Sequence, residues 1–272
     1  MVATTTQVAD MTRAVAGPDI AVEQILQPGS DPHEYEPRPS DAAAVAGAKL
    51  IVRSGGDVDS WLSGVIGQAG GDAKLVTLID TADREGDDPH WWQDPRNGES
   101  AVAAIARALA ETDPGHAAGY RARAAAYLKR LRALDGGIAR CVGQLEPQER
   151  KLVTSHDALG YYARRYGFTV TGAAIPSLST QAQPSAAGTK RLVDQIKAQH
   201  VAAIFPESAL NPKLEQAIAR DAGATVGGGL YADTLGPKGS AGATYLGALA
   251  ANTRTIVSAL SRGRVTCASL GR

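Results

Sequence analysis

The chain has 272 residues, with 28 lysines and arginines against 28 aspartates and glutamates, so its formal net charge is zero. A hydrophobic fraction of 44% is enough for a sizeable core, in one large domain or in two smaller lobes. The neutral charge argues against a nucleic-acid partner, and no apolar run approaches the roughly 20 residues of a membrane span. Abundant alanine, with short runs of valine, isoleucine and leucine between the helical segments, favours an α/β fold.

Short strands alternate with helices through the N-terminal part of the chain. We expect strands at 2–5, 21–26, 49–53 and 74–78, and helices between residue 5 and Gly17, from Ser40, over 59–66 and over 100–109. Two segments rich in proline, glycine and aspartate, 27–40 and 81–98, are expected as loops. This alternation is typical of βαβ units on a mainly parallel sheet.

The middle of the chain has a different pattern. From Pro114 to about Leu145 almost nothing would break a helix except Gly136-Gly137. Apolar residues recur at three- and four-residue spacing, which predicts one helix of about 30 residues, about 45 Å long. It is either a long core helix or a rigid spine between two lobes, and the spine explains better why βαβ units resume afterwards. The recurring residues are Tyr120, Ala124, Tyr127, Leu131 and Leu134.

The alternation of strands and helices returns in the C-terminal part. We expect strands at 151–155, 169–173, 201–205 and 224–226, and helices at 156–166, 189–199, 212–222 and 245–260. Loops are expected at 175–188 and 227–237. The sequence therefore predicts three parts: an N-terminal α/β lobe over 1–113, a rigid interlobe helix over 114–146, and a C-terminal α/β lobe over 147–272.

Two histidines follow the same local motif. Asp31-Pro32-His33 and Asp88-Pro89-His90 each lie in an expected loop after a strand. Proline fixes its own backbone and biases the residue before it away from helix, so each histidine is presented on a stiff loop. Loops that follow the strands of an open α/β sheet form its ligand crevice. One such motif indicates little more than a turn, but two in one lobe favour metal binding.

Two further polar residues also follow expected strands. His156 ends the strand at 151–155, where it is either a metal ligand or a histidine held by backbone contacts at a helix start. Asp233 follows a strand and a glycine run, where an Asx-turn is the simpler explanation. The remaining histidines, His116 and His200, are expected in solvent and at a helix C-terminus.

The two cysteines, Cys141 and Cys267, do not form a metal motif, because they are far apart and the chain has no CxxC. In an extracytoplasmic protein such a pair would form one disulfide, whereas in a cytosolic protein both thiols would be free and buried. The residues alone leave both readings open.

Four segments carry a resemblance to a known family. The run Asp31-Pro32-His33-Glu34-Tyr35-Glu36-Pro37 resembles the hallmark of the TroA-like solute-binding proteins of ABC transporters, the zinc- and manganese-uptake family. The segments 88–95, 153–161 and 230–233 resemble the other metal loops of that family, in the family's order. The similarity runs from Thr4 to Leu260 and includes the long central helix.

The resemblance implies a clamshell of two α/β lobes with a metal at their junction, held by His33, His90, His156 and Asp233. Three imidazoles and one carboxylate suit Zn²⁺ as bound cargo. Mn²⁺ is the alternative, but manganese-type members are expected to carry glutamate in place of His156. Glu207 follows a strand toward the cleft, where it either orients a ligand histidine or only begins the helix at 212–222. Trp91 and Trp92 either shield the site from water or pack against the adjoining loop.

The same resemblance implies an extracytoplasmic monomer, in the periplasm or at the cell surface, that delivers metal to a membrane permease. A lipid anchor on the full-length precursor stays open, and an extracytoplasmic location favours a Cys141–Cys267 disulfide. The segment 80–90 has no histidine except His90, so a His-rich metal-collecting loop is not expected. A metallohydrolase is the alternative from another class, but a fourth protein ligand closes the position that catalytic water needs, and the chain has no HExxH.

Overall fold

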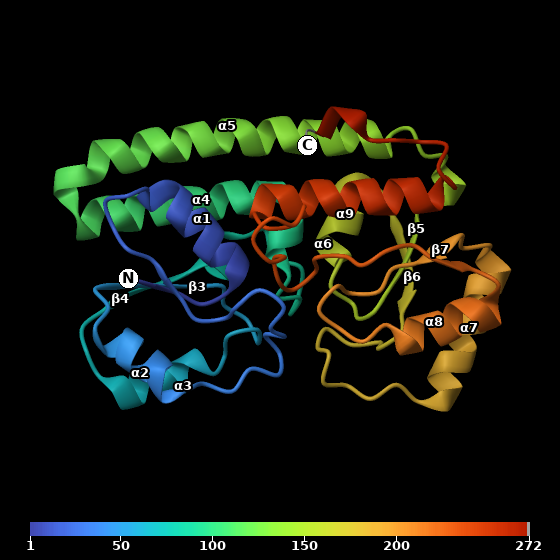
Figure 1. Cartoon of the computed structure of the whole chain (residues 1–272), viewed down its shortest axis with the longest axis horizontal. Helices are drawn as coiled ribbons and strands as arrows, with labels where there is room; N and C mark the ends of the chain where they lie inside the picture. Colours follow the sequence, from blue (N-terminus) through green and yellow to red (C-terminus); the bar gives the residue numbers. More distant parts are fainter. Residues whose placement is uncertain (271–272) are drawn as a thin grey trace. The chain divides into compact units, whose positions relative to one another are not determined.

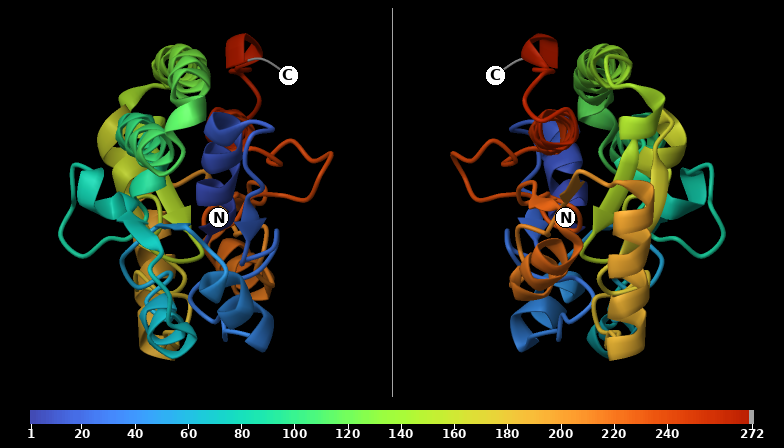
Figure 2. Two further views of the ribbon diagram at one scale, coloured as in Figure 1. Left: turned by 90° about the vertical axis from the view of Figure 1, so that its left-hand side faces the viewer. Right: turned by 90° about the vertical axis from the view of Figure 1, so that its right-hand side faces the viewer.

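Short parallel strands flanked by helices are found in both halves of the chain, as the computed structural model shows for residues 1–270 (Figures 1 and 2). The structure consists of two compact units that divide between Ala133 and Leu134. The predicted α/β class with mainly parallel sheets is therefore confirmed.

Four strands of the N-terminal unit form one parallel sheet in the order β2-β1-β3-β4. Side chains of a strand alternate between the two faces of its sheet. Ile51 of β3 packs with Leu62 and Val65 on the face covered by α2 and α3, whereas α1 and α4 lie on the other face (Figure 1). The strands are β1 (Val2–Ala3), β2 (Glu23–Gln24), β3 (Leu50–Arg53) and β4 (Lys74–Thr77).

Helix α1 (Thr6–Ala16) shows how local signals set the helix bounds in this unit. The Thr5 hydroxyl accepts a hydrogen bond from the Val8 N–H, and the helix ends at Gly17, whose φ of 61° favours glycine. Val8, Met11 and Val15 are buried, and their spacing places them on one face. The other elements are α2 (Pro39–Ala46), α3 (Leu62–Ala69), α4 (Pro95–Thr112) and the 3₁₀ turns η1 (Leu78–Thr81), η2 (Trp91–Gln93) and η3 (Pro114–His116).

The C-terminal unit has two parallel strand pairs, β5–β6 and β7–β8. The Phe205 N–H donates to the Val153 carbonyl at 2.8 Å, which places β7 beside β5. Val153 and Ile204 of these strands are fully buried against α7 and α8. The elements are β5 (Lys151–Thr154), β6 (Thr169–Ala173), β7 (Ala203–Ile204), β8 (Thr225–Val226), α6 (Gly160–Tyr166), α7 (Ala186–Gln199), α8 (Lys213–Ala222), α9 (Tyr245–Leu260), η4 (Pro147–Glu149) and η5 (Ala268–Leu270).

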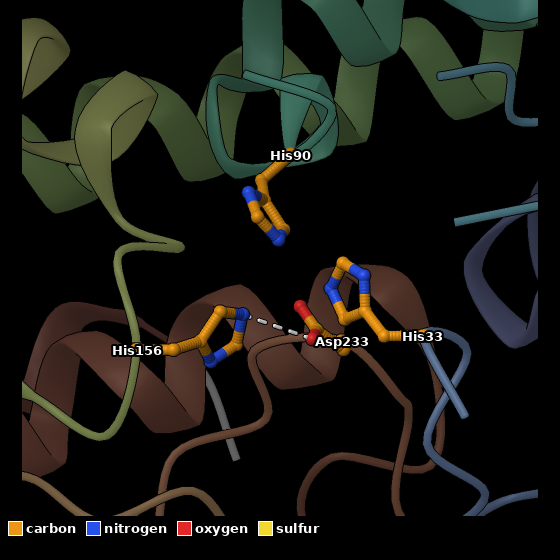
Figure 3. A group of neighbouring side chains, drawn as sticks. All are labelled: His33, His90, His156 and Asp233. Atoms are coloured by element: carbon orange, nitrogen blue, oxygen red, sulfur yellow. Dashed lines mark ion pairs between the residues drawn. The ribbon is translucent and has the colours of Figure 1, made fainter. Parts of the chain in front are cut away.

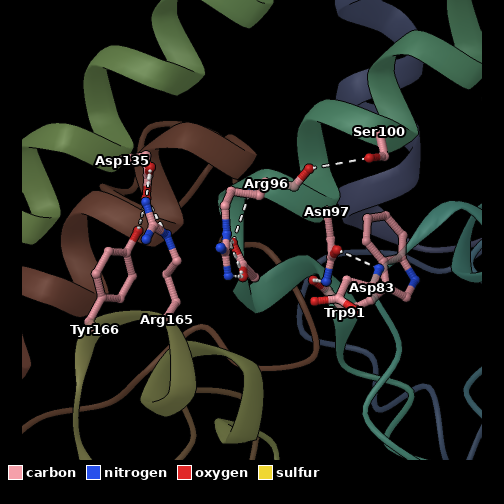
Figure 4. A network of polar contacts seen from close by, with 9 residues as sticks. Asp83, Trp91, Arg96, Asn97, Ser100, Asp135, Arg165 and Tyr166 are labelled. Atoms are coloured by element: carbon pink, nitrogen blue, oxygen red, sulfur yellow. Dashed lines mark hydrogen bonds and ion pairs between the residues drawn. The ribbon is translucent and has the colours of Figure 1, made fainter.

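The long central segment forms α5 (Ala117–Val142), a helix of 26 residues that contains the division between the units. It is shorter than predicted at both ends, because residues 114–116 form a 3₁₀ turn and the helix ends before Gly143. Gly137 lies inside it, where a Cβ would be 2.9 Å from the Leu270 side chain. Asp135 accepts hydrogen bonds from Arg165 at 2.5 Å and Tyr166 at 2.8 Å, which ties α5 to α6 (Figure 4).

Several predicted bounds are wrong. The helix predicted over 156–166 begins only at Gly160, because the Asp157 N–H donates to the Ser177 carbonyl and the chain around it is a loop. The predicted loop at 81–98 ends earlier, since Asp94 caps α4 and accepts the Arg96 N–H. Four predicted strands pair over only two residues each, namely those at 2–5, 21–26, 201–205 and 224–226. Within the part of the chain that is described, no helix is both long and apolar enough to cross a membrane.

Cys141 at the end of α5 and Cys267 form a disulfide across 126 positions, with their Cα atoms 5.5 Å apart. We predict that the native, unreduced protein titrates no free thiol. Replacing both cysteines by serine should lower the free energy of unfolding by as much as about 4–5 kcal/mol, because the unfolded chain loses a long closed loop. Thiol titration and denaturant unfolding measure the two effects, and two reactive thiols in the native protein would contradict the assignment.

Candidate metal site

Both Asp-Pro-His motifs form the same turn in the N-terminal unit. His33 follows β2 and His90 follows β4, at the carboxyl ends of two parallel strands. The carboxylate of Asp31 accepts the His33 N–H, and that of Asp88 accepts the His90 N–H, each at 2.9 Å. Each motif is therefore an Asx-turn, with the proline as its stiff middle residue. The two imidazole rings lie 5.7 Å apart between centroids (Figure 3).

The ring of His90 is held firmly on several sides. Its Nδ1 lies 2.7 Å from the Asp88 carboxylate, and the side chain is fully buried. Because a carboxylate accepts the Nδ1 proton, Nε2 keeps the lone pair that a metal needs. Trp92 packs edge-on against this ring with centroids 5.5 Å apart, and Trp91 donates to the Ser54 hydroxyl at 3.0 Å. Trp92 therefore contacts a candidate ligand, while Trp91 anchors the loop.

His33 has a carboxylate at Nδ1 too, at a longer distance. The Asp57 oxygen lies 3.6 Å from this nitrogen, and the Asp57 side chain is 52% exposed. Partial burial would raise the pKa of Asp57, but the contact with His33 and the charges of His33 and His90 lower it. Asp57 thus prefers to be ionised, as an acceptor for the imidazole should be.

The loop that carries Asp57 is built around a buried carboxylate. Asp59 accepts hydrogen bonds from the Ser54 and Gly55 N–H groups and pairs with Arg53 at 2.8 Å. Gly55 and Gly56 have φ of 89° and 76°, and a Cβ at Gly56 would lie 2.8 Å from Pro89. These contacts hold the Asp57 loop against the turn that presents His90.

The loop around His90 is also anchored to the start of α4. The Asn97 side chain accepts the Asp83 N–H at 2.9 Å and donates to the Trp91 carbonyl at 3.3 Å (Figure 4). The Arg96 guanidinium donates a hydrogen bond to the carboxylate of Asp94, the residue that caps α4, at 2.6 Å. Residues on both sides of His90 are therefore fixed by one helix N-terminus.

In the C-terminal unit, His156 lies between two carboxylates. Its Nε2 is 3.1 Å from Asp233 and its Nδ1 is 3.2 Å from Glu207 (Figure 3 shows the pair with Asp233). All three residues are at most 5% exposed. The other oxygen of Glu207 accepts the Asp233 N–H at 3.1 Å. Glu207 therefore binds both candidate ligands of this unit.

Electrostatics keep His156 protonated in this arrangement. Burial alone would lower its pKa, but the charges and hydrogen bonds of Asp233 and Glu207 raise the pKa of His156 to about 11. Burial and the charge of Asp233 raise the pKa of Glu207, against the effect of His156. A proton on Nε2 occupies the direction in which a cation would bind, so a metal ion has to replace that proton.

The candidate residues are thus found in two sets, each within its own unit. Ligand atoms of His33 and His90 lie within 4.8 Å of each other, and His156 lies beside Asp233. His116 instead pairs with Asp113 on an exposed turn, and His200 ends α7 with a φ of 54°. The contacts of Asp88 and Asp57 with the histidines were not predicted from the sequence. The repeated aspartate two residues before each histidine was a signal for Asp88, whereas nothing in the sequence singles out Asp57.

Comparison with known proteins identifies the class. A family model described as the periplasmic zinc-uptake complex component A, ZnuA, matches residues 1–259. The manganese-binding lipoprotein MntA of Halalkalibacterium halodurans is 32% identical over 259 residues, which cover 93% of this chain and 85% of that protein. The zinc-binding protein TroA of Treponema pallidum is 31% identical over 275 residues, which cover 96% and 89%. Its solved structure matches with a TM-score of 0.88 at 29% identity, over 95% of this chain and 98% of that one.

The match extends over nearly the whole chain and agrees with the fold. It defines the class as the metal-binding solute-binding proteins of ABC transporters, as the four sequence motifs indicated. Within that class, the chain belongs to the ZnuA family.

The contact of Asp88 with His90 can be tested by substitution. The substitution Asp88→Asn should weaken Zn²⁺ binding by about 10- to 100-fold, because the imidazole loses the carboxylate that fixes its tautomer and orientation. Asp87→Asn is the matched control, since Asp87 is the exposed neighbour and should leave affinity unchanged. Competition with a chromophoric chelator measures both. Equal affinities for the two variants would show that Asp88 does not orient a ligand.

The raised pKa of His156 leads us to expect that metal binding releases a proton. A pKa raised from 6.5 to about 11 stabilises the metal-free fold below about pH 6.5, and this contribution is lost as the pH rises toward 11. At about pH 7.5, Zn²⁺ binding should therefore release about one proton from His156. Calorimetry in buffers of different ionisation enthalpy counts this proton. A binding enthalpy that does not depend on the buffer would contradict the expected exchange.

Proposed function

We propose that this protein captures Zn²⁺ outside the cytoplasm and delivers it to the permease of an ABC transporter. The observation that supports the proposal is that each unit brings two candidate metal ligands together. The N-terminal unit has the two oriented imidazoles of His33 and His90, and the C-terminal unit has His156 beside Asp233. Three nitrogens and one oxygen are a common tetrahedral set for zinc.

Neither half is sufficient by itself for tight binding, since structural zinc sites use four ligands. We infer that the two units act as lobes that share one ion, with α5 as the helix that joins them. Such a division has a functional advantage, because displacing one lobe removes two ligands at once. A permease that separates the lobes would therefore release the metal without competing for each ligand in turn.

Zinc is proposed over manganese on the chemistry of the ligands. The relatives include proteins named for either metal, so similarity does not decide between them. Imidazole suits zinc, whereas Mn²⁺ prefers oxygen ligands and lies lowest in the general order of divalent affinities. With His156 as the third candidate ligand in chain order, Asp233 is the only carboxylate of the set, and this disfavours the binding of manganese.

A binding role is proposed rather than catalysis. Catalytic zinc sites keep one position for water, whereas four protein ligands close the tetrahedral site. Glu207 is the nearest buried carboxylate to His156 besides Asp233, and it is engaged with both candidate ligands rather than available as a general base. A metallohydrolase would require a free coordination position that this set does not provide.

The location is proposed from the disulfide and from the relatives. The bond between Cys141 and Cys267 indicates an oxidising compartment. The matching family is described as periplasmic, and MntA is named as a lipoprotein. We therefore place this protein in the periplasm or at the cell surface, as a monomer.

The substitution His156→Glu tests the choice of metal. The parent should bind Zn²⁺ more tightly than Mn²⁺ by orders of magnitude, and His156→Glu should narrow the gap chiefly by weakening zinc. Competition titrations with both ions measure the two affinities.

His156→Ala tests the ligand itself, with His116→Ala as the matched control, since the His116 side chain is 56% exposed and pairs only locally. Zinc affinity should collapse in the first variant and persist in the second. Zinc affinity within a few-fold of the parent in His156→Ala would remove His156 from the site. A parent that prefers manganese would overturn the choice of zinc.

A further inference from the structure

A chain of buried polar contacts leads from the candidate ligands into helix α8. The N–H of Glu207 donates to the Ser155 hydroxyl oxygen at 2.9 Å. That hydroxyl in turn donates to the carboxylate of Glu215 at 2.5 Å. All three residues are at most 5% exposed, and Ser155 and Glu215 are 60 positions apart in sequence.

The direction of these hydrogen bonds is fixed by chemistry. A backbone N–H can only donate, so the Glu207 N–H donates to a lone pair of the Ser155 hydroxyl. The hydroxyl keeps its one proton for the Glu215 carboxylate. From this backbone position the Glu207 carboxylate reaches His156 Nδ1 with one oxygen and the Asp233 N–H with the other.

The position of Glu215 in the first turn of α8 has a simpler explanation, since acidic residues there interact favourably with the helix dipole. That explanation requires neither burial nor a partner. Glu215 is 3% exposed and contacts the residue that directly precedes His156. Burying a carboxylate is costly, and the hydrogen bond from Ser155 satisfies only one of its oxygens, since Oε2 is buried with no hydrogen-bond partner among the described residues. The helix dipole alone does not account for a carboxylate that is buried at this cost.

We propose that Ser155 and Glu215 are positioning residues for the C-terminal half of the metal site. They hold the backbone of Glu207 so that its carboxylate orients His156 and Asp233 together. The inference rests on the proposed function and adds to it the residues that set the geometry of the zinc ligands. Neither residue belongs to the group of candidate ligands.

Two substitutions test the proposal, each with a matched control. Ser155→Ala removes the hydroxyl, and Ser261→Ala removes another buried hydroxyl of the same unit that also accepts a backbone N–H, from Val265 at 3.0 Å. Glu215→Gln removes the charge but keeps the shape, and Asp221→Asn removes an exposed carboxylate from the same helix. Zn²⁺ affinity is measured by chelator competition, and ligand geometry by the visible spectrum of the Co²⁺-substituted protein.

We expect Ser155→Ala and Glu215→Gln to weaken Zn²⁺ binding by about tenfold and to alter the Co²⁺ spectrum. Both controls should keep the parent affinity and spectrum, whatever their thermal stability. If Ser155→Ala does not fold, Glu215→Gln decides the question by the same measurements. Parent-like affinity and spectrum in Glu215→Gln would overturn the proposal. A parent protein that binds no Zn²⁺ would instead overturn the proposed function, so the two failures are distinguishable.

Discussion

A carboxylate lies at the Nδ1 atom of each of the three candidate histidines, and the rest of the site depends on this contact. The partners are Asp57 for His33, Asp88 for His90 and Glu207 for His156. An acceptor at Nδ1 fixes the orientation of the ring and leaves Nε2 as the nitrogen that can bind a cation, in His156 after its Nε2 proton has been released. It also supplies negative charge near a group of candidate ligands that includes only one carboxylate. The loops of both units are built to keep these acceptors in place.

The α/β architecture explains how such loops arise. Parallel strands end at a common edge, and the segments that follow them are free to carry polar groups. In the N-terminal unit two Asx-turns and the buried Asp59 hold the loops at that edge. In the C-terminal unit Glu207 contacts both candidate ligands, and its backbone N–H is held by Ser155, which in turn donates to Glu215 of α8. The two units thus reach similar ligand environments with different side chains.

Much of this could be predicted from the sequence, and the exceptions have physical reasons. The alternation of elements predicted the parallel sheets, and the repeated Asp-Pro-His motif pointed to two histidines that do lie side by side. The loop at His156 was wrongly predicted as the start of a helix. Its conformation depends on the hydrogen bond from the Asp157 N–H to the Ser177 carbonyl, and a contact so distant in sequence leaves no local pattern. Asp57 and Glu215 could not be found either, since their roles come from tertiary contacts that no local pattern records.

We propose that one zinc ion is bound by ligands from both units. Crystals of the zinc-loaded protein, measured at the zinc absorption edge, would test it most directly. We expect one anomalous peak with His33, His90, His156 and Asp233 around it, at about 2.0–2.2 Å from their ligand atoms. A peak bound by the residues of one unit only, or by other side chains, would contradict it.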